Sequence, residues 1–282
     1  MQPRKVEELI ASHPTADGAG VKLRRIVSPD GMRRLDPFLL LDEFGSDDAD
    51  DYSGGFPPHP HRGFETVTYM LEGQMRHEDH LGNVGRLVSG GVQWMTAGRG
   101  VIHSEMPEQE SGRMRGFQLW INLPAAEKMG DPGYRDIPPE AIPTRTLAGG
   151  IVVKVIAGRF EHAGEVVAGA VEKVATAPLY LDLELPADSA LTLPVTPGHT
   201  ALVYVYDGAV IVAGQPVPAQ RLAVLGDGDA VVLEGGAQGG RALLLAARPL
   251  GEPVAHHGPF VMNTRAEIEQ ALEDYRTGRL TG

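Results

Sequence analysis

The sequence has no cysteine among its 282 residues. This absence excludes disulfides, cysteine-ligated zinc, iron–sulfur clusters, thiolate-bound haem and a cysteine nucleophile. No run of 18 consecutive apolar residues occurs, so no membrane-spanning segment is expected. Residues 1–20 contain no apolar stretch long enough for a signal peptide, and we therefore expect a cytoplasmic protein.

Positive charge is also scarce. There are 25 Lys and Arg residues against 37 Asp and Glu residues, which gives a net charge of −12. A chain of this charge is disfavoured for sequence-independent contact with nucleic-acid phosphates, so no direct nucleic-acid partner is expected. None of the glycine clusters is followed by Lys-Ser/Thr or has the dinucleotide spacing, so a phosphate-binding loop is not expected either.

Turn-forming residues are abundant, with 36 glycines and 22 prolines, and 42% of the chain is hydrophobic. Runs rich in β-branched and aromatic residues alternate with these turns, at residues 66–71, 92–95, 117–121, 151–156, 179–185, 201–206, 209–212, 230–233 and 242–245. Short strands at this spacing predict an all-β sandwich or barrel architecture. The proline-rich stretch 124–143 predicts a bridge between two domains, residues 1–135 and residues 136–282.

The last residues have a different pattern. A capping box, Thr264-Arg265-Ala266-Glu267, precedes an apolar stripe at helical spacing, and Gly278 suits a helix end. The pattern predicts an amphipathic helix over residues 264–277 that covers a barrel wall. We assign this helix to the second domain.

Two charged segments lie near the start of the chain. The basic one contains Lys22, Arg24, Arg25, Arg33 and Arg34, around a turn predicted at residues 29–31. It is interpreted first as a solvated strand face and second as a docking surface for an acidic protein partner. The acidic segment, residues 42–51, is expected to form an exposed loop.

Four of the side chains suit a metal site. His59 and His61 are spaced i, i+2, as are His103 and Glu105. On neighbouring strands such pairs would point to one side and could converge on one ion. Imidazole suits iron, copper, nickel and zinc, and a carboxylate favours iron or manganese. The spacing alone equally allows a chance arrangement, because His-x-His also occurs without a metal.

The residues around these pairs resemble a known family. Residues 59–73, HPHRGFETVTYMLEG, resemble the first cupin motif in its pirin form, and residues 91–107, GVQWMTAGRGVIHSEMP, resemble the second. Shorter similar pieces occur at residues 35–44, 118–123, 252–254, 258–264 and 278–280, whereas the His256-His257 pair departs from the family pattern. The resemblance to pirins therefore spans almost the whole chain, although residues 145–245 match mainly in their β character.

This resemblance implies an all-β bicupin, with two antiparallel jelly-roll barrels and a C-terminal helix. It implies one mononuclear non-haem iron, Fe2+ or Fe3+, in the first barrel, with Mn, Ni, Cu or Zn as alternatives. The implied metal ligands are His59, His61, His103 and Glu105. Glu65 is the rival carboxylate, because ordinary cupins use His-x-His-x-x-x-Glu. The second barrel, where His199 stands alone, is expected to be metal-free.

Further residues near the motifs are less clearly assigned. Trp94 and Phe117 are expected to wall a substrate pocket, with ordinary core packing as the alternative, and Gln118 is expected to reach substrate or water. His77 and His80 are spaced i, i+3 and are expected to be solvated at a hairpin tip.

The resemblance implies a quercetin 2,3-dioxygenase activity. Glu105 would be the catalytic base that accepts the 3-hydroxyl proton of a flavonol, and O2 would then open the ring with release of carbon monoxide. The alternative is a redox-sensing, metal-gated interaction protein, either a transcription cofactor or a modulator of a metabolic enzyme. A third interpretation is a metal-holding cupin that acts on an unrelated substrate.

Overall fold

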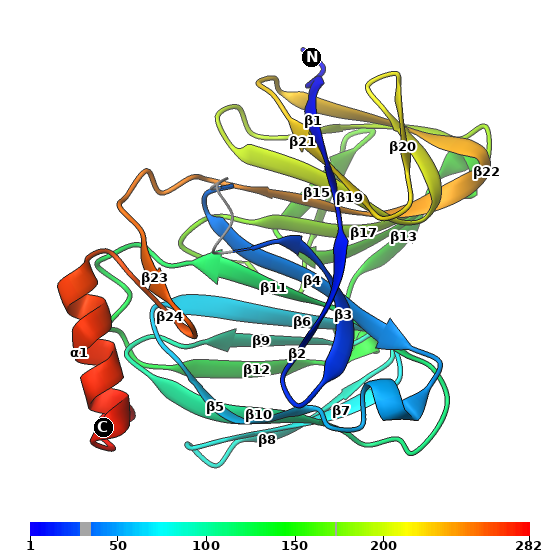
Figure 1. Ribbon diagram of the computed structural model, residues 1–282. Helices are drawn as coiled ribbons and strands as arrows, with labels where there is room; N and C mark the ends of the chain where they lie inside the picture. Colours follow the sequence, from blue (N-terminus) through cyan, green and yellow to red (C-terminus); the bar gives the residue numbers. More distant parts are fainter. Residues whose placement is uncertain (29–34, 173) are drawn as a thin grey trace. The chain divides into compact units, whose positions relative to one another are not determined.

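The computed structural model describes residues 1–28, 35–172 and 174–282 (Figure 1). Strands dominate these residues, which divide into two compact units. The N-terminal unit comprises residues 13–139 and 250–282, and the C-terminal unit comprises residues 1–12 and 140–249. In the described part of the chain, no helix is both long and apolar enough to cross a membrane.

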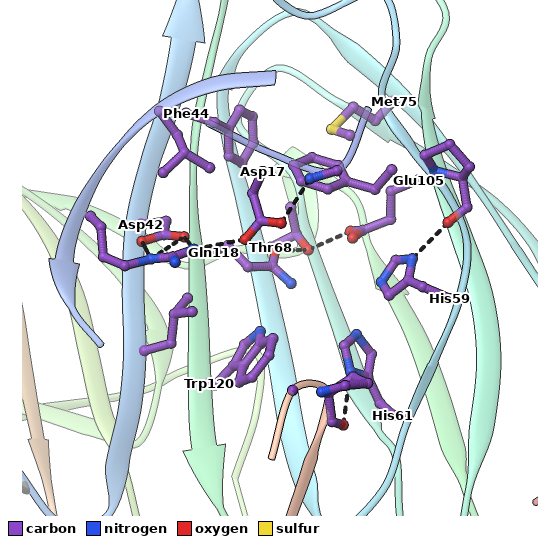
Figure 2. Close-up of a pocket in the computed structure, with 18 of the residues that line it drawn as sticks. Asp17, Asp42, Phe44, His59, His61, Thr68, Met75, Glu105, Gln118 and Trp120 are labelled. Carbon is purple, nitrogen blue, oxygen red and sulfur yellow. Dashed lines mark hydrogen bonds and ion pairs between the residues drawn. The ribbon is translucent and has the colours of Figure 1, made fainter. Parts of the chain in front are cut away.

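The N-terminal unit contains two antiparallel sheets, with strand orders β12-β9-β6-β11-β4-β3-β2 and β5-β10-β7-β8. Inward side chains of both sheets line a cavity, which is drawn in Figure 2. The strands are β2 (His13–Asp17), β3 (Val21–Val27), β4 (Phe38–Ser46), β5 (Phe56–His61), β6 (Phe64–Glu72), β7 (Gln74–Asp79), β8 (Val84–Val88), β9 (Val92–Thr96), β10 (Val101–Pro107), β11 (Met114–Asn122) and β12 (Gly133–Ile137), with a short 3-10 helix η1 (Ala49–Asp51).

The C-terminal unit has a nine-stranded antiparallel sheet and a small hairpin. Alternate residues of its strands form a purely aliphatic and aromatic core, as a period-2 pattern requires. Its strands are β1 (Val6–Ala11), β13 (Thr144–Thr146), β14 (Val152–Ala157), β15 (Arg159–His162), β16 (Glu165–Ala168), β17 (Leu179–Leu185), β18 (Ala190–Pro194), β19 (Thr200–Val212), β20 (Gln215–Pro218), β21 (Arg221–Leu225) and β22 (Ala230–Ala247), with 3-10 helices η2 (Pro139–Ala141) and η3 (Ala148–Gly150).

The all-β prediction is confirmed, and the predicted strand runs fall within observed strands, except that the run 151–156 begins one residue before β14. Two pairs of runs are each a single bent strand, because β19 contains residues 201–206 and 209–212, and β22 contains residues 230–233 and 242–245. Register shifts interrupt β19 around Gly208, whose φ of +64° favours glycine. Such bulges let one long strand bend and continue.

The expectation that residues 136–282 form one domain with their helix was wrong. Helix α1 (Arg265–Arg276) and hairpin β23 (Ala255–His257)–β24 (Phe260–Met262) belong to the N-terminal unit, and strand β1 belongs to the C-terminal unit. The apolar stripe of α1 has its partners at Phe260, Met262 and Ile102, while β1 extends a sheet by pairing with β21. Figure 1 shows α1 beside β23 and β24.

The prediction of an exposed loop over residues 42–51 was wrong for its first residues, which belong to strand β4. Asp42 and Glu43 are buried within β4, because neighbouring strands supply their counter-charges. Arg115 of β11 lies 2.6 Å from Glu43, and Arg25 of β3 lies 2.7 Å from Asp42. Arg33, Arg34 and the turn predicted at residues 29–31 lie outside the described residues.

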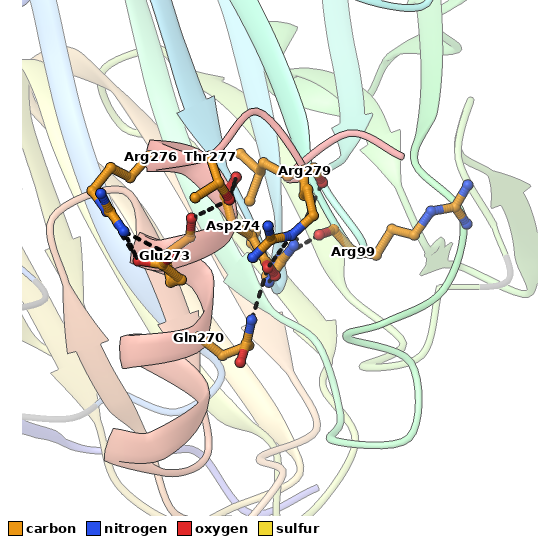
Figure 3. A network of polar contacts seen from close by, with 9 residues as sticks. Arg99, Gln270, Glu273, Asp274, Arg276, Thr277 and Arg279 are labelled. Carbon is orange, nitrogen blue, oxygen red and sulfur yellow. Dashed lines mark hydrogen bonds and ion pairs between the residues drawn. The ribbon is translucent and has the colours of Figure 1, made fainter.

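Two buried cations fasten the 250–282 segment to the barrel. Lys128 Nζ donates to the carbonyl oxygens of Gly63 (2.6 Å) and Val261 (3.0 Å) and to Asn122 Oδ1 (2.5 Å). Arg62 donates to the Arg99 carbonyl oxygen and lies 2.8 Å from Asp274 on α1. Figure 3 shows the polar network around Asp274, which also accepts a hydrogen bond from Gln270.

We expect Asp274→Asn to lower the free energy of unfolding of the N-terminal unit by about 1–3 kcal/mol, because it leaves a buried Arg62 without its counter-charge. Arg62 holds the pKa of Asp274 below the usual range, so the wild-type advantage should be present at neutral pH and disappear as the pH falls below about 4. Urea denaturation followed by tryptophan fluorescence measures this, because both tryptophans, Trp94 and Trp120, lie in this unit.

The matched control is Glu273→Gln on the same helix. Glu273 pairs with Arg276, whose side chain is 73% exposed, so its loss should change the unfolding free energy by less than about 1 kcal/mol. Equal effects of the two variants would show that the Arg62–Asp274 pair does not anchor the helix.

Candidate metal centre

Antiparallel pairing of β5 with β10 brings the two histidine-bearing segments together. In this register His103 lies opposite His59, and Val101 lies opposite His61. The imidazole centroids are 4.3 Å apart for His59–His103, 4.7 Å for His59–His61 and 5.0 Å for His61–His103. One nitrogen from each ring lies within 4.8 Å of the others, which is a geometry that can hold a metal ion.

Hydrogen bonding leaves the same nitrogen, Nε2, available on each ring. The Nδ1 atom of His59 lies 2.8 Å from the Pro57 carbonyl oxygen, and that of His61 lies 3.4 Å from the Pro259 carbonyl oxygen. Nδ1 of His103 lies 3.4 Å from Nδ1 of His77. Nε2 of His103 is buried with no hydrogen-bond partner among the described residues. Because an orphaned buried nitrogen is costly, the site fits an ion that this nitrogen would coordinate.

The electrostatics of the cluster also suit metal binding. Burial, reinforced by the charge of His59, lowers the pKa of His61 well below the usual value. Burial likewise lowers the pKa of His103, with the neighbouring His61, His59 and His77 adding to the shift. Both rings are therefore neutral at pH 7, which is the form that coordinates metals.

Glu105 lies in the same cavity but outside this three-histidine group. A register irregularity between His103 and Glu105 places Glu105 opposite Phe56. Its side chain is buried, and Oε1 accepts a hydrogen bond from Thr68 Oγ1 at 2.9 Å. The role of Glu105 as fourth ligand remains a prediction. The rival Glu65 does not line the cavity. Its Oε1 accepts a hydrogen bond from Thr96 Oγ1 at 2.9 Å, and burial raises the pKa of its carboxyl group.

A cavity of about 550 Å³ adjoins the histidines (Figure 2). Apolar side chains from both sheets form much of its wall, namely Leu23, Leu40, Phe44, Phe56, Met75 and Trp120. Its polar lining consists of Asp17, Arg25, Asp42, His59, His61, Thr68, Glu105, Gln118 and His256. This volume is within the range of sites for drug-sized ligands.

Cross-strand register explains why the polar lining forms a row. Thr68 of β6 lies opposite Gln118 of β11, Gln118 lies opposite Asp42 of β4, and Asp42 lies opposite Arg25 of β3. Thr68 Oγ1 also lies 2.6 Å from Gln118 Oε1. Since Thr68 has one hydroxyl hydrogen, it can donate either to Glu105 or to Gln118, so these two groups compete for it.

The row ends in an ion-pair cluster of Arg25, Asp42 and Asp17. Arg25 Nε donates to Asp42 Oδ1 at 3.0 Å, and Arg25 Nη2 donates to Asp17 Oδ2 at 2.8 Å. Burial raises the pKa of Asp42 to about 6, although Arg25 acts in the opposite direction. With both carboxylates ionised, this end of the cavity carries more negative than positive charge.

The predicted pocket residues lie on opposite faces of the sheet, because successive side chains of a strand alternate between its two faces. Gln118 lines the cavity, but Trp94 and Phe117 do not, and that part of the prediction was wrong. Phe117 is adjacent to the inward Gln118 and therefore faces the other side of the sheet, where its ring lies 6.4 Å from that of Tyr69. Trp120, two residues beyond Gln118, supplies the aromatic wall instead. Sequence reasoning missed Trp120, although period-2 counting from Gln118 would have found it.

Comparisons with known proteins agree with the resemblance seen in the sequence. The pirin family model matches residues 20–121, and the model of the pirin C-terminal cupin domain matches residues 180–281. A Pseudomonas aeruginosa protein named "Putative quercetin 2,3-dioxygenase PA3240" is 55% identical over 98% of this chain and 98% of its own. A "Pirin-like protein" of Caulobacter vibrioides is 51% identical over 99% of this chain and 100% of its own.

A solved structure is also similar over nearly its whole length. The crystal structure of a quercetin 2,3-dioxygenase from Acinetobacter baumannii aligns with a TM-score of 0.90 and 35% identity, covering 99% of this chain and 98% of that one. The bicupin fold implied by the sequence resemblance is therefore confirmed.

Single substitutions should distinguish the side chains that bind the metal from those that do not. We expect protein reconstituted anaerobically with Fe2+ to retain about one ion per chain, and His103→Ala to weaken binding by at least about 100-fold. Glu105→Gln should weaken it by about 10-fold, whereas Glu65→Gln, a change of the same chemistry outside the cavity, should bind as wild type does. Metal analysis and chelator competition measure these affinities. Identical binding by the two glutamine variants would remove Glu105 from the ligand set.

Proposed function

Because the chain belongs to the pirin family, we propose that it is an iron-dependent dioxygenase that opens the ring of a flavonol with O2. The observation that carries the proposal is the group of three imidazoles beside a cavity of about 550 Å³. The names of the Pseudomonas and Acinetobacter relatives support the substrate class.

His59, His61, His103 and Glu105 are the proposed iron ligands. When bound, such an ion supplies Lewis acidity and one-electron chemistry with dioxygen. The protein residues hold the substrate and move its proton. Oε1 of Glu105 lies 2.9 Å from Thr68 Oγ1, so the other carboxylate oxygen, Oε2, is proposed to accept the 3-hydroxyl proton of the flavonol.

The two ends of the cavity suit a flat, polyhydroxylated aromatic molecule. Phe44, Phe56 and Trp120 provide apolar surface for its rings. At the end remote from the imidazoles along the polar row, the carboxylates of Asp42 and Asp17 can accept hydrogen bonds from phenolic hydroxyls. The excess of carboxylate over guanidinium there disfavours an anionic group on the ligand.

The alternative of a metal-gated interaction protein depended on the basic cluster near the start of the chain. Within the described residues, Lys22 lies 2.5 Å from Asp51, and Arg25 is held by Asp42 and Asp17. These charges are therefore already compensated inside the unit, which favours the enzyme. A chain that turns over no flavonol but binds a protein partner only when iron is bound would support the alternative.

We expect the iron-loaded protein to consume O2 and release carbon monoxide in the presence of quercetin. His103→Ala, treated with the same iron, should lose this activity because it lacks a ligand. An oxygen electrode measures the O2 consumed and gas chromatography measures the carbon monoxide released, with free Fe2+ as the blank. Turnover no faster than the blank would rule out a flavonol as substrate.

The polar end of the cavity predicts a pH effect on substrate binding. Protonation of Asp42, with a pKa of about 6, removes a charged acceptor, so the KM for quercetin should rise as the pH falls through 6. Asp42→Asn should raise this KM by about 10-fold at pH 7.5 and flatten its pH dependence, because a hydrogen bond to a charged group is lost.

The internal control is 3-hydroxyflavone, which keeps the reacting hydroxyl but lacks the hydroxyls that would reach Asp42. Its KM should be the same for wild type and Asp42→Asn. A parallel rise for both flavonols would show that Asp42 supports the cavity wall and does not contact the substrate.

A further inference from the structure

His77 lies behind the three-histidine group and is not part of it. Strand β7 pairs with β10 so that His77 lies opposite Glu105, and Asp79 lies opposite His103. The His77 ring is 1% exposed and stacks on Tyr134, with centroids 4.3 Å apart and planes inclined by 20°. The expectation of a solvated hairpin-tip histidine was therefore wrong for His77.

A chain of polar contacts leads from a carboxylate to the metal-binding ring. Asp79 Oδ2 lies 3.3 Å from His77 Nε2, and His77 Nδ1 lies 3.4 Å from His103 Nδ1. The chain ends at His103 Nε2, the buried nitrogen with no partner among the described residues. Asp79, His77 and His103 thus form one linear series inside the barrel.

Asp79 is fixed at the start of this series by the turn that follows it. Backbone N–H groups of Leu81 and Asn83 both donate to Oδ1 at 3.0 Å, and the Asn83 side chain donates to Oδ2 at 2.8 Å. Burial alone would raise the pKa of Asp79, but the hydrogen bonds from Asn83 and His77 outweigh it and lower the pKa. The side chain is therefore an ionised carboxylate, which can only accept hydrogen bonds.

An acceptor at one end sets the direction of every bond in the series. His77 must carry a hydrogen on Nε2 to donate to Asp79, and in that tautomer its Nδ1 is an acceptor. His103 must then donate from Nδ1, which leaves the lone pair on Nε2. This tautomer presents a metal-binding lone pair on the side of His59 and His61.

We propose that Asp79 and His77 are positioning residues that fix the tautomer and ring orientation of His103 for metal binding. The inference rests on the metal site proposed above and extends it beyond the ligands. Among the described residues, the Nδ1 partners of His59 and His61 are backbone carbonyl oxygens, whereas His103 is linked through His77 to a carboxylate. Partners of this kind also increase the basicity of a metal-binding imidazole.

Two variants test the series by different routes. His77→Phe keeps a ring to stack on Tyr134 but removes the acceptor for His103. Asp79→Asn keeps the shape but lets the amide donate to His77 Nε2, which would reverse His77 and impose the wrong tautomer on His103. The same substitution disables the histidine of a serine-protease triad in this way.

The matched control is His80→Phe, from the same hairpin. His80 Nδ1 accepts a hydrogen bond from the Ile102 backbone N–H at 3.3 Å, and in the described part of the chain His80 is not a member of the three-histidine group. Urea denaturation of each metal-free variant, followed by tryptophan fluorescence, establishes that the N-terminal unit is folded before its metal affinity is compared.

The measurement is Co2+ affinity by chelator competition, together with the visible spectrum of the Co2+ protein. We expect His77→Phe and Asp79→Asn to bind 10- to 100-fold more weakly, as is typical for lost outer-shell partners, with a shifted spectrum, and His80→Phe to match wild type. Wild-type affinity and spectrum in both test variants would overturn the inference. A loss as complete as that in His103→Ala would also overturn it, because His77 would then be a ligand. If wild type itself binds no Co2+, the proposed metal site fails.

Discussion

The site depends on bringing the imidazoles of His59, His61 and His103 together at one point. Antiparallel pairing of β5 with β10 sets their spacing, and burial keeps His61 and His103 uncharged. A buried nitrogen lone pair without a partner is unfavourable unless something occupies it. A bound cation would therefore stabilise the arrangement. The hydrogen bonds at the Nδ1 atoms leave the three Nε2 atoms free to coordinate that cation.

The segment after residue 250 contributes directly to this centre. Pro259 supplies the carbonyl oxygen beside His61, and Lys128 links Gly63 to Val261. Arg62, adjacent to a proposed ligand, is held by Asp274 of α1. The helix thus belongs functionally to the barrel that holds the histidines, although more than a hundred residues separate the two in sequence.

A row of polar side chains lines the cavity wall that leads away from the imidazoles. The row from Thr68 through Gln118 and Asp42 to Arg25 crosses four strands of one sheet, and each member is placed by its neighbour's register. Such a row combines polar groups with apolar walls, which can orient an aromatic ligand that carries hydroxyl groups. The same principle of register places Asp79 and His77 behind His103.

The sequence by itself determined the strand-rich class, the capped helix and the three histidines, because period-2 alternation, capping chemistry and i, i+2 spacing are local properties of a chain. Tertiary structure alone decided which unit α1 joins, which face Trp94 and Phe117 take, that Asp42 is buried in the cavity wall, and that His77 is buried against His103. These outcomes depend on pairing between distant strands, and a shift of one residue in that pairing would turn every side chain to the opposite face.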